Sequence, residues 1–66
     1  MSIIKVIEIL ANSTESWEDA AKKGVKQASR TVKNIKSVYV KEQNALVNGE
    51  NITEFRVNLK ISFEVS

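Results

Sequence analysis

The sequence predicts an α+β fold of β-α-β-β order, in which a three-stranded antiparallel sheet curls around one amphipathic helix. Three observations predict it. Apolar and small residues recur at helical spacing between Ser16 and Ile35. A β-branched, apolar segment, typical of a strand, runs from Ser2 to Leu10. In the segment from Thr53 to Val65, polar and apolar residues alternate strictly from Glu54 onward, as in a half-buried strand. With 66 residues, we expect one domain over residues 1–66.

The first predicted strand, Ser2 to Leu10, is apolar on both faces, because only Lys5 and Glu8 interrupt it. Such a strand is either buried on both sides or presents its second face to another subunit. A monomer of this size has little with which to cover both faces. We therefore favour contact between subunits.

The helix is expected to follow a polar turn at residues 11–15 and to begin at Trp17, with Ser16 and Asp19 arranged as in a capping box. Asn34 is the expected C-terminal stop. These limits give a helix of about 18 residues, roughly 27 Å long. Its apolar face comprises Trp17, Ala20, Ala21, Gly24, Val25, Ala28, Val32 and Ile35. Gly24 in mid-helix indicates a close approach to a strand.

The opposite face of the predicted helix carries a basic stripe. The stripe comprises Lys22, Lys26, Arg30 and Lys33. We interpret it first as a solvated outer face that complements the helix dipole. The alternative is a surface that contacts phosphates.

A second strand is expected from Ile35 or Lys36 to Val47, followed by a hairpin at Asn48-Gly49. The third strand, Thr53 to Val65, should lie between the first and second strands, because the helix makes a right-handed crossover. One face of this third strand is predicted to pack on the helix. Its other face is polar and should line solvent or an enclosed cavity.

The composition excludes several classes of function. The chain has no Cys and no His, so disulfides, common zinc sites and Ser-His-Asp or Cys-His catalysis are ruled out. No nucleophile and base pair is identifiable, and we expect no enzymatic activity. A domain this small then needs oligomerisation for stability. A formal net charge of +2 is too small to predict a nucleic-acid partner by overall field, and we expect none.

The chain also lacks a signal peptide pattern and any apolar run long enough to span a bilayer. We therefore expect a cytoplasmic protein with no membrane partner.

The sequence resembles the dodecins, a family of small β-α-β-β proteins, over nearly its whole length. The matching stretches are residues 5–9, 13–20, 28–35, 40–43 and 53–63. The resemblance implies a hollow, spherical homododecamer of cubic symmetry that binds riboflavin or related flavins, such as FMN, at subunit interfaces. It implies sequestration of a small-molecule ligand rather than catalysis.

The resemblance also implies where a flavin would bind. The family stacks the flavin ring on a Trp at the start of the second strand and hydrogen-bonds the ring edge with a Gln in the third strand. Ser37 occupies the Trp position and Arg56 the Gln position. Ser37 offers no aromatic face, and Arg56 lacks the acceptor of an amide. Tyr39, two residues further on, is the candidate replacement aromatic.

A flavin-free dodecin with a structural or calcium-binding role is the alternative, since family members without the Trp have been associated with calcium. Calcium takes several oxygen ligands. Glu42, Glu54 and Glu64 are the carboxylate candidates, with Gln43 and Asn58 as further oxygen donors across interfaces.

Overall fold

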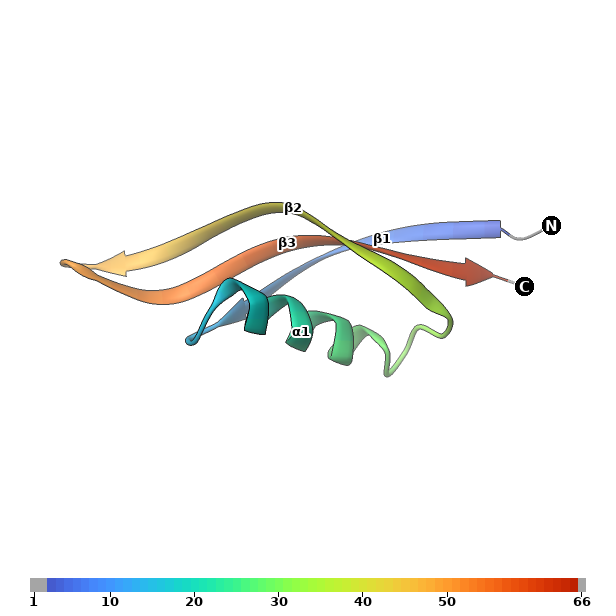
Figure 1. Ribbon diagram of the computed structural model, residues 1–66, viewed down its shortest axis with the longest axis horizontal. Coiled ribbons are helices and arrows are strands. Elements are labelled where there is room, and N and C mark those ends of the chain that lie inside the picture. Colours follow the sequence, from blue (N-terminus) through green and yellow to red (C-terminus); the bar gives the residue numbers. More distant parts are fainter. Residues whose placement is uncertain (1–2, 66) are drawn as a thin grey trace.

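The structure is a computed structural model that describes residues 3–65 and confirms the predicted order of elements (Figure 1). The elements are β1 (Ile3–Ser13), α1 (Trp17–Ala28), β2 (Ile35–Asn48) and β3 (Asn51–Val65). The sheet is antiparallel, in the order β1-β3-β2, with α1 on one face. Ser2, the predicted start of the first strand, lies outside the described residues. Within residues 3–65, no helix is both long and apolar enough to cross a membrane.

The core lies between α1 and the central strand β3. The side chains of Val57, Leu59 and Ile61 alternate along β3 and are 2%, 0% and 0% exposed, and Ala20 of the helix is 0% exposed. Partly buried residues of β1, α1 and β2 pack around them: Ile7, Ile9, Ala11, Trp17, Ala21, Val25, Ala28 and Ile35. Full burial of each large aliphatic side chain is worth about 1.5–3 kcal/mol. The alternation predicted for β3 is therefore confirmed.

The helix is shorter than predicted, because it ends at Ala28 and contains 12 residues, about 18 Å. The Ser29 hydroxyl donates to the Lys26 carbonyl at 2.7 Å, and the Thr31 hydroxyl to the Ala28 carbonyl at 3.4 Å. Such local bonds offer the backbone an alternative to continued helix. Asn34, the expected stop, instead has a φ of 63° in the connection to β2.

Two strand boundaries also differ from the prediction. β1 continues past Leu10 to Ser13, so part of the expected polar turn is strand. β3 begins at Asn51 rather than Thr53, because Asn48 pairs directly with Asn51. The hairpin loop is thus Gly49-Glu50. Gly49 has a φ of 66°, and a glycine at the first central position is characteristic of a type II′ turn.

The strands are longer than the helix, and the β2–β3 hairpin projects beyond it (Figure 1). The pairing of β2 with β3 shifts register at Lys36, Lys41 and Thr53, and such bulges increase sheet twist. The Trp17 indole N–H donates to the Asn44 carbonyl at 2.8 Å and so ties the base of the hairpin to the helix.

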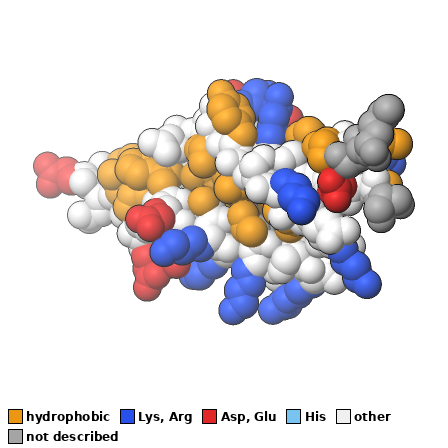
Figure 2. All heavy atoms as spheres, turned by 45° about the vertical axis from the view of Figure 1, so that its right-hand side comes forward, with side chains coloured by type: hydrophobic (Ala, Val, Ile, Leu, Met, Phe, Trp, Pro, Cys, Tyr) orange, Lys and Arg blue, Asp and Glu red, His pale blue; other side chains and the backbone are white. Residues whose placement is uncertain are grey.

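Hydrophobic side chains gather at the hairpin end of the molecule in Figure 2. In the hairpin, Leu46, Val47 and Ile52 are 41%, 64% and 53% exposed.

Candidate functional site

The sheet face turned away from α1 holds the three predicted flavin-contact residues and the three predicted glutamate ligands, whereas Gln43, opposite the buried Val57, lies on the face toward α1. Directly opposed residues on neighbouring strands share a face. The pairs on this outer face of β2 and β3 are Ser37 with Ser62, Tyr39 with Lys60, Glu42 with Asn58, Asn44 with Arg56, and Leu46 with Glu54. Glu64 lies on the same face of β3, opposite Ile4 of β1. The outer face is therefore the candidate binding surface.

Ser37 and Tyr39, two of the three flavin-contact candidates, lie near one end of this surface. The Ser37 and Ser62 hydroxyls hydrogen-bond to each other. Tyr39 stands opposite Lys60 and is 64% exposed. An exposed phenol ring beside a cation offers an aromatic face to a ligand.

Arg56, the third candidate, lies away from Ser37 and Tyr39. It is opposite Asn12 of β1 and Asn44 of β2, where it lines a pocket of about 140 Å³ with Leu10, Ala11 and Asn12. Lys60, which stands opposite Tyr39, and Arg56 are four positions apart on β3, about 13 Å. One chain therefore does not bring the three candidates together, and a shared site needs residues from a second copy.

The three glutamates predicted as calcium ligands are also separated. Glu54 accepts a hydrogen bond from the Asn12 amide, whereas Glu42 is exposed and opposite Asn58. Glu54 and Glu64 are ten residues apart on β3, about 33 Å. Within residues 3–65, no group of three or more Asp, Glu, His or Cys residues lies close enough to hold a metal. A calcium site from these glutamates needs several copies of the chain.

A polar cluster at the middle of the outer face was not predicted from the sequence. Lys41 Nζ lies 3.6 Å from Glu8 Oε2. A hydrogen bond from the Asn58 side chain holds the pKa of Glu8 below its usual value, and the charges of Lys41 and Lys60 act in the same direction. The Asn58 side-chain oxygen is buried and has no hydrogen-bond donor among residues 3–65.

The register explains why this cluster was missed. Glu8 stands opposite Lys60, and Lys41 is the extra residue of a bulge in β2. Once the register is known, the lone Glu8 in an apolar strand indicates a cross-strand charge pair. The sequence does not give the position of the bulge.

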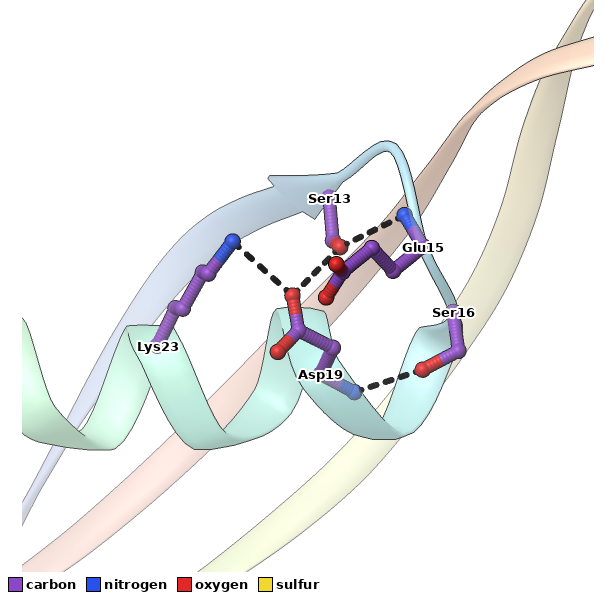
Figure 3. Close-up of polar contacts among 5 residues, drawn as sticks. All are labelled: Ser13, Glu15, Ser16, Asp19 and Lys23. Carbon is purple, nitrogen blue, oxygen red and sulfur yellow. Dashed lines mark hydrogen bonds and ion pairs between the residues drawn. The ribbon is translucent and has the colours of Figure 1, made fainter.

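A second polar cluster joins the end of β1 to the start of α1 (Figure 3). The Ser13 hydroxyl donates to Asp19 Oδ2 at 2.6 Å, and Lys23 Nζ lies 2.9 Å from the same oxygen. The hydrogen bond from Ser13, and then Lys23, lowers the pKa of Asp19, and Asp19 in turn raises the pKa of Lys23. The Ser16 hydroxyl accepts from the Asp19 backbone N–H at 2.9 Å, so the predicted N-terminal cap is present. These contacts fix the turn between strand and helix.

A family model described as Dodecin matches residues 3–66. The chain is 37% identical over 65 residues to a protein from Mycobacterium tuberculosis named calcium dodecin, a match that covers 98% of this chain and 92% of that protein.

Solved structures that share the fold of this chain include two dodecins. Dodecin from Streptomyces davaonensis has a TM-score of 0.93 and 26% identity, covering 98% of this chain and 96% of that chain. Calcium dodecin from Mycobacterium tuberculosis has a TM-score of 0.84 and 36% identity, covering 98% of this chain and 93% of that chain. The latter is described as a calcium-chelating immunodominant antigen with a novel calcium-binding site.

Proposed function

The chain belongs to the dodecin family, and on this premise we propose that it is a self-assembling, non-enzymatic protein that binds and stores a small ligand, with calcium as the ligand. The observation that carries the proposal is the buried Asn58 oxygen without a donor, on the outer sheet face opposite the Glu42 carboxylate. A carbonyl oxygen and a carboxylate are ligands that calcium prefers.

Self-association is supported by apolar side chains on the outer face of β1. Ile4, Val6 and Leu10 are 50%, 58% and 70% exposed. They alternate with inward-facing residues, so they form a row on the face away from α1. Exposed apolar rows of this kind mark protein interfaces. A closed homododecamer, as in the family resemblance, is the assembly that we propose for these surfaces.

The residues of one chain fit a calcium site only in part. Calcium takes six to eight oxygen ligands, and the neighbourhood of Asn58 offers its own amide oxygen and the Glu42 carboxylate. Glu8 is engaged by Lys41 and Asn58. We therefore place the site between copies, where Glu42, Glu54 and Glu64 of different chains supply further oxygens. Bound calcium would link subunits electrostatically.

Flavin is the second candidate ligand, favoured by the exposed Tyr39 ring beside Lys60. Ser37 in place of the family Trp removes a stacking surface worth about 0.5–1.5 kcal/mol beyond area burial. Arg56 in place of the Gln donates hydrogen bonds and accepts none. Riboflavin or FMN binding would then depend on Tyr39 and on Arg56 from a neighbouring copy.

Titration calorimetry with calcium tests the proposal. We expect calcium binding by the assembled protein and at least about tenfold weaker binding by Glu42→Gln, equivalent to about 1.4 kcal/mol. Glu50→Gln is the matched control, because it removes the same charge in the hairpin turn, and it should bind as the wild type does. Equal binding by both variants would place the site elsewhere, and no binding at millimolar calcium would refute the proposal. Loss of flavin binding in Tyr39→Ala, with retention in Tyr39→Phe, would support the second candidate.

A further inference from the structure

The charge of the chain is distributed very unevenly along the sequence. Seven of the ten Lys and Arg residues fall within residues 20–41, a segment that contains no Asp or Glu. They are Lys22, Lys23, Lys26, Arg30, Lys33, Lys36 and Lys41. The rest of the chain has three basic residues against all eight acidic ones. The chain therefore contains a strongly basic segment although its net charge is small.

All seven basic residues of this segment are exposed at the surface. Figure 2 shows Lys and Arg side chains along the edge formed by the helix and the segment that follows it. Two of the seven form ion pairs within the helix: Lys22 Nζ lies 3.3 Å from Glu18 Oε1, and Lys23 Nζ lies 2.9 Å from Asp19 Oδ2.

The four basic residues further along make no such pair. Within residues 3–65, no carboxylate lies within 4.0 Å of the side chains of Lys26, Arg30, Lys33 or Lys36. We call these four residues the cationic row. The unbalanced charge thus begins in the last turn of α1 and continues into the start of β2.

The cationic row is poorly suited to self-assembly. Cores of protein interfaces are depleted of charged residues. A symmetric contact through this row would oppose like charges, and burial of unpaired charges is costly. The apolar rows on β1 and the hairpin suit assembly better. An assembled particle would then display one cationic row per subunit.

We propose that the cationic row binds nucleic acid through its phosphate backbone, without reading sequence. Lys and Arg that neutralise phosphates supply this kind of affinity. The exposed residues next to Lys26 and Arg30 along the chain, Gln27, Ser29 and Thr31, are polar. The row and the residues between its members include no aromatic side chain, so base stacking has no platform within it.

Several copies of the row on one particle would act together. Each row offers few phosphate contacts, so a single subunit should bind weakly. Linked copies turn later contacts into intramolecular ones and raise the overall affinity. This binding is independent of the ligand site on the outer sheet face, which involves other residues.

Fluorescence anisotropy with a labelled 30-nucleotide oligo(dT) and a duplex of equal length tests the proposal, at several salt concentrations in buffer with chelator. We expect binding that weakens steeply with salt. Arg30→Glu should weaken it at least tenfold and reduce the salt slope by about 1 for each row that contacts the nucleic acid. Lys5→Glu is the matched control, because it makes the same change in net charge at an exposed residue of β1. It should change the affinity less than twofold, and Arg30→Lys should bind like the wild type.

Sedimentation of both variants tests whether the assembly is unchanged, and we expect the wild-type sedimentation coefficient for each. Equal losses in Arg30→Glu and Lys5→Glu would show that binding follows net charge alone and would overturn the proposal. Absence of binding by the wild type at low salt would also overturn it, as would binding to phosphatidylglycerol vesicles without binding to either nucleic acid. Glu42→Gln should retain nucleic-acid binding, which separates this result from the calcium proposal.

Discussion

Substitution of Gly24 by Ala tests how closely the helix packs on the sheet. A Cβ at this position would lie 2.8 Å from Leu59 Cδ1, 3.1 Å from Ala11 Cβ and 3.5 Å from Ile9 Cδ1. The Leu59 methyl is the end of a side chain, but that side chain is 0% exposed and has little room to turn. The Ala11 Cβ moves only with the backbone of β1.

Two opposing effects decide the sign of the result. Ala is better than Gly in a helix by about 1 kcal/mol. Overpacking of a well-packed core costs about 1–3 kcal/mol. Because Leu59 and Ala11 both resist displacement, we expect the packing cost to exceed the gain and Gly24→Ala to lower the free energy of unfolding by about 1 kcal/mol.

Urea unfolding followed by circular dichroism, at fixed protein concentration, measures this change. Gln27→Ala, at an exposed helix position, is the control and should stay within about 0.5 kcal/mol of the wild type. Leu59→Val should relieve the crowding, so the double variant should be at least about 0.5 kcal/mol more stable than the sum of the single effects. Stabilisation by Gly24→Ala would refute the close packing of helix and strand.

Three further predictions concern the turns and the hairpin. Trp17→Phe should lower the free energy of unfolding in urea by about 1 kcal/mol, because it removes the hydrogen bond to the Asn44 carbonyl. An unchanged urea midpoint would show that this bond does not hold the hairpin. Asn34→Ala should lower the free energy of unfolding in urea by about 1–2 kcal/mol, because Asn34 has a φ of 63°, which disfavours Ala. Asn34→Gly should cause no such loss, since Gly adopts positive φ freely. Equal losses in the two variants would argue against this backbone conformation. The Asp19 pKa is lowered from 3.8 in the folded chain, so its contribution to stability is present above that pH and is lost as pH falls below it. The stability difference between wild type and Asp19→Asn should therefore shrink from about pH 5 to about pH 3. A constant difference would contradict the hydrogen bond from Ser13.

The parts of the fold that follow from hydrophobic period were predictable. Strict alternation in β3 placed Val57, Leu59 and Ile61 in the core, and they are buried. The end of the helix was not predictable in this way, because Val32 and Ile35 continue the apolar spacing beyond Ala28. Hydrogen bonds of Ser29 and Thr31 to the backbone compete with that pattern.

The candidate site was predictable only as a surface. Alternation in β3 places Arg56 and Asn58 on the polar face, and the sheet register adds Tyr39 and Glu42. The bulge at Lys41, which brings Lys41 to Glu8, has no clear sequence signal. The predicted calcium ligands of one chain lie far apart along the sheet. A single sequence does not show how several copies of the chain would bring them together.

Equilibrium dialysis of the assembled protein against calcium and, in a parallel cell, against riboflavin tests the proposed function most directly. We predict bound calcium with a Kd of about 10 μM or tighter, within the range of protein calcium sensors. We predict no retention of riboflavin at micromolar concentration, because Ser37 provides no stacking face. Retention of riboflavin without bound calcium would contradict the calcium proposal and move the ligand site to Tyr39.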